Sequence, residues 1–103
     1  MLFRSDHDHD EEIDSTHIVL DTSFDPVFLR ERLETIVREQ EVYRVKGFVS
    51  VPDKTMRLVV QGVGSRFEDF YDRSWKPEEP RLTKLVFIGK HLNRSQIEST
   101  LKA

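Results

Sequence analysis

Hydrophobic and polar residues follow regular periods from Thr16 onward, and these periods predict the secondary structure. The short β-branched segment 16–20 predicts a strand. Residues 26–40 predict an amphipathic helix, with Asp25 as its N-cap and Pro26 as its first residue. The apolar positions that recur at helical spacing are Phe28, Leu29, Leu33, Ile36 and Val37.

The middle of the chain predicts an antiparallel hairpin. Residues 43–51 alternate in polarity, and the positions expected on one face are Tyr43, Val45, Val49 and Val51. Residues 52–55, with the sequence Pro-Asp-Lys-Thr, are typical of a turn. They lead into a second strand over 56–63, which we expect to pair with the first.

Near the C-terminus, the pattern predicts one further strand and a closing helix. Residues 83–89 contain the consecutive apolar run Leu85–Ile88, which is typical of a central strand covered on both faces. Asn93 is expected to cap the closing helix, with Gln96 three residues later. The apolar seam of this helix comprises Ile97 and Leu101.

Residues 64–82 are expected to be irregular because Gly64, Pro77 and Pro80 interrupt the pattern. A short strand at 67–71 is the alternative within this segment. The predicted order is therefore β-α-β-β-β-α. This order indicates an α+β fold. We expect a two-layer sandwich, in which a mainly antiparallel sheet of about four strands carries two helices on one face.

A single helical layer covers one face of such a sheet, whereas the run Leu85–Ile88 requires cover on both. We expect part of this cover to come from aromatic residues in the segment 64–82. The remainder would come from a partner surface or from a domain missing from this chain. The aromatic residues are Phe67, Phe70, Tyr71 and Trp75.

The charge distribution divides the 103 residues into two parts. Residues 1–14 carry a net charge of −5 and little apolar surface, so we expect a flexible acidic linker rich in His and Asp. Residues 15–103 carry a net charge of +2 and are long enough for one compact core. This near balance is not typical of a nucleic-acid-binding domain.

Composition excludes several classes of protein. No apolar run reaches 18 residues, so we expect no contact with a membrane. The absence of cysteine excludes disulfides and thiolate metal sites, and we expect a cytoplasmic protein. Residues 61–66 lack the P-loop pattern despite two glycines, and the acidic pair Glu78-Glu79 is expected to be solvated. We therefore expect that this chain is not an enzyme.

The acidic tract offers a candidate metal site. His7 and His9 alternate with Asp8 and Asp10, and imidazole is a good ligand for zinc, cobalt, nickel and copper. His17 would supply a third nitrogen. Because a flexible segment loses entropy on wrapping an ion, we expect weak and exchangeable binding. A merely solubilising linker and a cloning remnant are the two alternative interpretations.

Two features are candidates for ligand or protein binding. Lys46 beside Gly47 presents an ammonium next to a bare backbone, which suits either an anion or a surface salt bridge. The aromatic residues of 64–82 suit either stacking on a ligand or a small satellite core. The candidate binding residues are Lys46, Phe67, Phe70, Tyr71 and Trp75.

Four motifs together resemble the C-terminal domain of the CobW family. They are YRVKGF at 43–48, LVVQGVG at 58–64, Trp75, and PRLTKLVFIG at 80–89. The resemblance extends over 15–103, and the His/Asp tract before it is similar to the linker that joins the two domains in this family. Among the branches of this family, the sequence of residues 44–48 and 52–63 is most similar to that of the CobW proteins associated with cobalamin biosynthesis.

The resemblance implies a parent protein that is a P-loop GTPase and a chaperone for cobalt, zinc or similar ions. Its Walker motifs and Cys-rich metal motif have no counterpart here, so no catalytic residue transfers, and GTP and magnesium would belong to the absent domain. What transfers is a small module that contacts the GTPase domain, a partner protein or another subunit.

We therefore expect a non-catalytic regulatory and protein-interaction domain of a GTP-dependent cobalt or zinc chaperone linked to cobalamin biosynthesis. We expect no tightly bound cofactor, and only transient cobalt or zinc in the tail. The expected partners are the parent GTPase domain, a metal-receiving protein and a second copy of the chain. The alternative is a free-standing module that binds a small ligand or peptide and has an incidental acidic tail.

Overall fold

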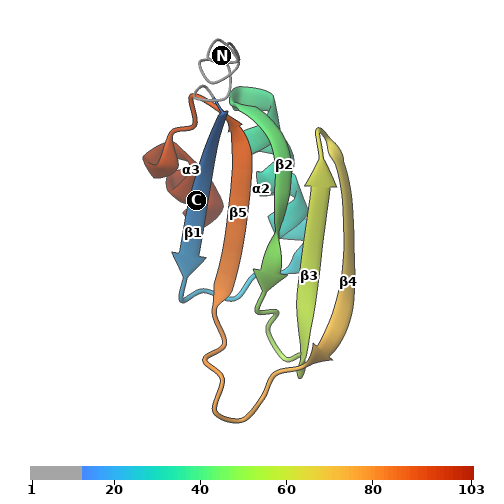
Figure 1. Cartoon of the computed structure of the whole chain (residues 1–103). Helices are drawn as coiled ribbons and strands as arrows, with labels where there is room; N and C mark the ends of the chain where they lie inside the picture. The colour runs from blue at the N-terminus through green and yellow to red at the C-terminus, as the bar shows by residue number, and fades with distance from the viewer. Residues whose placement is uncertain (1–12) are drawn as a thin grey trace, which may run out of the picture.

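The computed structural model describes residues 13–103, which form a five-stranded antiparallel sheet and two helices. The elements are β1 (Ile13–Leu20), α2 (Pro26–Glu39), β2 (Glu41–Val49), β3 (Met56–Val63), β4 (Arg66–Ser74), β5 (Thr83–Lys90) and α3 (Arg94–Lys102). The strand order is β1-β5-β2-β3-β4, and α2 and α3 lie on the same face of the sheet (Figure 1). The predicted α+β class is confirmed. Within the described part of the chain, neither helix is long or apolar enough to cross a membrane.

The sheet has one strand more than the four predicted. Residues 66–74, expected to be largely irregular, form β4 and pair with β3 along its whole length. This strand lies at the edge of the sheet, and most of its side chains are exposed on both faces. Because an edge strand with many charged residues shows no alternation of apolar and polar positions, the sequence pattern did not reveal it. Its charges protect the edge of the sheet against pairing with another strand. The order is therefore β-α-β-β-β-β-α.

Both helices begin at the predicted caps. The Asp25 carboxylate accepts hydrogen bonds from the backbone N–H groups of Val27 and Phe28, both at 3.1 Å, and Pro26 is the first helical residue. The Asn93 side chain accepts a bond from the backbone N–H of Gln96 at 3.0 Å. These bonds satisfy donors that have no partner within the helix, so sequence chemistry determines where each helix starts.

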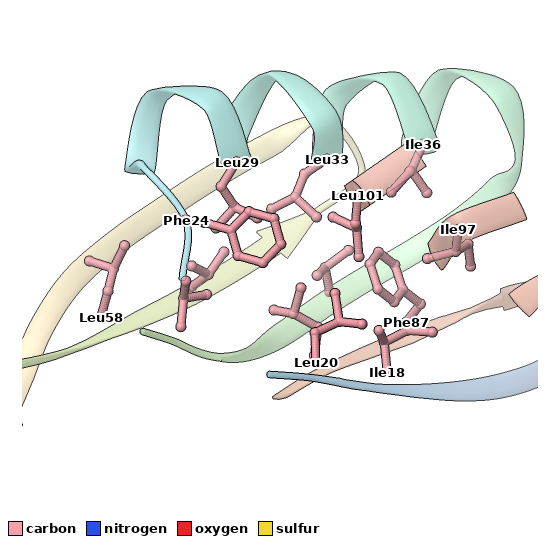
Figure 2. Packing of buried hydrophobic residues seen from close by; sticks show 14 of the residues in the cluster. Ile18, Leu20, Phe24, Leu29, Leu33, Ile36, Leu58, Phe87, Ile97 and Leu101 are labelled. Atoms are coloured by element: carbon pink, nitrogen blue, oxygen red, sulfur yellow. The ribbon is translucent and has the colours of Figure 1, made fainter. Parts of the chain in front are cut away.

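The core is one apolar layer between the helices and the sheet. Side chains from both helices meet side chains from β1, β3 and β5 there, and the fully buried Phe87 lies under α3 (Figure 2). The labelled residues of the layer are Ile18, Leu20, Phe24, Leu29, Leu33, Ile36, Leu58, Phe87, Ile97 and Leu101. Burial of this kind contributes roughly 25 cal/mol for each Å² of apolar surface removed from water.

The face assigned to Tyr43 was wrong. A bulge shifts the register between β2 and β5 at this residue, so Val42 enters the core and Tyr43 turns outward. The Tyr43 hydroxyl donates to the Glu41 carboxylate at 2.7 Å, and this bond raises the pKa of the phenol. A simple alternation count fails here because a bulge inserts one unpaired residue into the strand.

The strands β2 and β5 approach each other closely at two glycines. A Cβ atom at Gly47 would lie 2.0 Å from the carbonyl oxygen of Lys84, and one at Gly89 would lie 2.0 Å from that of Glu41. No side chain fits at either position without a shift of the backbone. These glycines therefore allow β5 to sit beside β2 in the centre of the sheet.

We expect Gly89→Ala to lower the free energy of unfolding by about 2–3 kcal/mol, because the backbone must move to admit a methyl group. The matched control is Gly64→Ala, because no atom lies within 4 Å of the added Cβ. The only loss of stability there comes from placing alanine at a positive φ. We expect about 1 kcal/mol for this control. Urea unfolding measures both, and an equal loss in the two variants would contradict the close-approach argument.

The connection from β4 to β5 is held by an ion pair that the sequence did not predict. Glu79, expected to be solvated, accepts two hydrogen bonds from the Arg73 guanidinium at 2.9 and 2.8 Å and one from the backbone N–H of Lys76. Chiefly because Arg73 donates to the carboxylate, the pKa of Glu79 falls from 4.5 to about 2. This pair fixes the start of the loop that carries Trp75.

The Arg73–Glu79 pair predicts a pH dependence of stability. The pKa of Glu79 is lower in the folded chain than in the unfolded one, so its contribution is present above pH 4.5 and is lost as the pH falls toward about 2. Glu79→Gln should remove this component, whereas Glu78→Gln should retain it. Urea midpoints measured from pH 6 to pH 2 test this, and an unchanged pH profile for Glu79→Gln would refute it.

Candidate functional site

The face of the sheet opposite the helices carries the candidate site, and we call it the open face. Leu85 and Phe87 point toward the helices, so the residues between and around them on β5 point the other way. Residues paired across an antiparallel sheet share a face, which assigns the other strands. The members are Ile13, Ser15, His17, Val19, Glu41, Arg44, Lys46, Phe48, Val59, Gln61, Val63, Arg66, Glu68, Phe70, Lys84, Val86, Ile88 and Lys90.

Apolar side chains on the open face remain accessible. Val19 on β1 is 54% exposed, Val63 on β3 is 62% exposed, and Phe70 on β4 is 48% exposed. Val86 and Ile88, in the apolar run of β5, are only half-buried. Residues 13–103 therefore cover the second face of β5 only in part. Exposed apolar side chains on one face are typical of an interaction surface.

The open face is also positively charged. Arg44 and Lys46 on β2, Arg66 on β4 and Lys84 on β5 form no ion pair with any residue in the range 13–103. The acidic side chains on this face are Glu68, which is opposite Gln61, and Glu41, which is opposite Lys90 and accepts a hydrogen bond from Tyr43. The cations lie among apolar residues, so a partner of opposite charge would gain both electrostatic and apolar contacts.

An open concavity of about 580 Å³ lies over the β2–β3–β4 half of the open face. The open-face side chains that line it are Arg44, Lys46, Gln61, Val63, Arg66 and Glu68. Its volume is within the range of roughly 300–1,000 Å³ that small-molecule sites occupy. The concavity therefore has three cations, one amide and one carboxylate on its wall.

A stack of rings and guanidinium groups covers the other end of β2. The Phe48 ring meets the Trp75 ring edge to face at a centroid distance of 5.9 Å. The Arg57 guanidinium lies over Phe48 at 4.4 Å, and the Arg81 guanidinium lies over Trp75 at 5.6 Å. These are the distances of cation–π interactions. The stack attaches the β4–β5 loop to the sheet.

Both arginines of the stack are already engaged. Arg57 donates to the Asp72 carboxylate, which lowers the pKa of Asp72. Arg81 donates to the carbonyl oxygens of Val51 and Lys54 at 3.2 and 2.7 Å. Trp75 Nε1 is buried and has no hydrogen-bond partner among the described residues. The stack thus holds the β4–β5 loop against the sheet beside the open face.

The structure separates the candidate binding residues into two groups. Lys46 and Phe70 lie on the open face, and Trp75 contacts it through Phe48. Phe67 lies on the helix face, where its ring covers Gly62, and Tyr71 also lies on that face opposite Leu58. The aromatic residues of 64–82 therefore do not form a single stacking platform or a single satellite core.

The candidate metal ligands are only partly described. His7, Asp8, His9 and Asp10 lie outside the described residues. His17 is exposed on the open face of β1, where its Nε2 lies 3.3 Å from the Ser15 hydroxyl. Within residues 13–103, no group of three or more His, Asp or Glu residues could hold a metal ion.

Sequence reasoning missed several residues of the open face. Phe48 and Lys84 join the surface through pairing between strands that are distant in sequence, and Arg66 joins it through the unpredicted strand β4. Alternation alone indicated that Arg44 and Lys46 lie on the exposed side of β2. Extending the same alternation through β5 would have assigned Lys84, Val86 and Ile88 to one face, but only the register between the strands pairs Val86 with Lys46 and Ile88 with Arg44.

Comparisons with known proteins identify the domain. Residues 13–103 match the family described as "Cobalamin synthesis protein cobW C-terminal domain". The zinc chaperone CobW of a Sinorhizobium species is 46% identical over 86 residues, which are 84% of this chain and 24% of that protein. The zinc chaperone CobW of Pseudomonas aeruginosa is 45% identical over 74 residues, which are 72% of this chain and 20% of that protein.

A solved structure has the same fold. The crystal structure of the Zn(II)-bound YjiA GTPase from Escherichia coli superimposes with a TM-score of 0.78 and 27% sequence identity. The match covers 99% of this chain and 32% of that chain. This chain spans about a quarter of the length of the curated CobW relatives. It belongs to the CobW family, whose C-terminal domain it matches from residue 13 to residue 103.

Proposed function

We propose that this domain is the non-catalytic regulatory and protein-interaction module of a GTP-dependent metal chaperone. The observation that carries the proposal is the open face, which combines accessible apolar side chains with unpaired cations and has no helix over it within residues 13–103. Apolar contacts at the centre of an interface supply affinity, and charges around them orient the partner. We assign an acidic protein surface to this face.

The GTPase domain of the parent protein is the first partner in this proposal, and a metal-receiving protein is the second. The curated relatives are longer than this chain, and the structural relative is named a GTPase, which supports a neighbouring nucleotide-binding domain. The nucleotide state of that domain would change its contact with the open face. A second copy of the chain is a further partner in this proposal, and we assign the whole assembly to the cytoplasm.

Zinc is the metal best supported by the comparisons, because the relatives are named zinc chaperones and the structural relative is zinc-bound. We also include cobalt in the proposal, because the description of the family names cobalamin synthesis. We assign transient metal binding to His7 and His9, with carboxylates from Asp8 and Asp10. Two imidazoles on a short segment favour weak binding, which suits transfer of the ion to a partner.

The docking proposal predicts that Val19→Asp weakens binding to a GTPase domain. The probe is the part of the Sinorhizobium zinc chaperone CobW that precedes the matched domain, immobilised with GTP or GDP. An aspartate on the open face would bury a charge against an acidic partner, so we expect a loss of about tenfold in affinity.

The matched control is Val27→Asp on α2, which is 67% exposed on the helix side of the domain. Both variants add one carboxylate at an exposed valine, so both should keep the fold. Biolayer interferometry should show normal binding for Val27→Asp. Equal loss in the two variants, or no loss in either, would rule out docking through the open face.

The metal proposal predicts that His7→Ala combined with His9→Ala abolishes the heat of zinc and cobalt binding in calorimetry of the whole chain. Substitution is preferable to truncation at Ser15, because β1 begins at Ile13 and pairs with Lys90 from its first residue. His91→Ala is the control, since it removes one imidazole elsewhere. Unchanged zinc binding in the double variant would show that the tract is a tether.

A further inference from the structure

The concavity over β2, β3 and β4 holds a concentration of positive charge that the fold does not explain. Arg44 and Lys46 are two residues apart on the same face of β2, a separation of about 7 Å. Arg66 lies in the same row as Arg44, across Val63, at roughly 10 Å. None of the three cations forms an ion pair with a residue in the range 13–103.

Such an arrangement costs stability in the unliganded domain. Like charges on neighbouring positions of a sheet repel one another, and the wall of the concavity carries three cations against the single carboxylate of Glu68. Elsewhere on the sheet, arginines are paired: Arg57 binds Asp72 and Arg73 binds Glu79. The contrast indicates that the cations of the concavity are arranged for an anion that comes from outside this domain.

The side-chain chemistry narrows the class of anion. Two guanidinium groups offer planar forks of N–H donors that match phosphate oxygens, and the Lys46 ammonium adds a mobile point charge. Gln61 lies between Lys46 and Glu68 in the register and can add an amide donor. Three positive charges suit an anion with several negative charges rather than a single carboxylate.

We propose that this concavity is a binding site for a small soluble anion with two linked phosphate groups. Arg44 and Arg66 hold the two groups from opposite sides, Lys46 neutralises the charge between them, and Gln61 donates to a bridging or terminal oxygen. Glu68 opposes binding and so selects against weakly charged anions. The proposal rests on the cation cluster and the concavity, and the docking proposal uses the same cations, so a bound anion and an acidic partner would compete for them.

Calorimetric titration of the whole chain with inorganic pyrophosphate, without magnesium and at low salt, tests the site. We expect saturable binding with one site per chain, weakened at least about tenfold by Arg44→Gln or Arg66→Gln because each removes a charge-assisted contact. Glu68→Gln should bind more tightly than the unchanged chain. Higher salt should weaken binding, since the site is open to solvent.

The control is Arg38→Gln on the exposed surface of α2, which makes the same charge change outside the concavity. This variant should bind pyrophosphate normally. The proposal fails if pyrophosphate gives no saturable heat, or if Arg38→Gln weakens binding as much as Arg44→Gln. Citrate is a carboxylate anion of similar charge. If citrate binds as tightly as pyrophosphate, the site does not select phosphate and that part of the proposal is wrong.

Discussion

The fold depends on one apolar layer, because residues 13–103 contain only two helices with which to cover the sheet. Phe87 and Leu85 of β5 are almost completely buried, and Figure 2 shows the side chains of Ile97 and Leu101 of α3 beside that of Phe87. Since β5 pairs with both β1 and β2, this strand brings the start and the middle of the chain together. Both helices lie on one face, so no helix within residues 13–103 covers the opposite face, where only the β4–β5 loop packs through Trp75 on Phe48.

The helices could be predicted closely because their signals are local. Asp25, Pro26 and Asn93 act within a few residues of themselves, and each does what its chemistry predicts. The missed features depend on pairing. The edge strand β4 has no apolar alternation to detect, and the bulge at Tyr43 reverses the faces expected for Val42 and Tyr43. Such features need the partner strand to be known.

The candidate site was predicted in part for the same reason. Closeness in sequence suggested that the aromatic residues of 64–82 act together, but strand alternation sends Phe67 and Phe70 to opposite faces of β4. The surface that does form joins residues from strands far apart in sequence: Lys46 of β2 lies between Val86 of β5 and Gln61 of β3. The Arg73–Glu79 ion pair likewise could not be predicted, because the sequence around an acidic loop residue does not indicate which cation it will contact.

The central claim is that the two faces of the sheet have different tasks, one for folding and the other for recognition. Chemical-shift mapping of the valine and isoleucine methyl groups, during addition of the part of the Sinorhizobium zinc chaperone CobW that precedes the matched domain, tests this claim most directly. Shifts should concentrate at Val19, Val86 and Ile88 on the open face, while Val27 on α2 stays unchanged. Shifts concentrated on the surfaces of α2 and α3, with the open face unaffected, would contradict it.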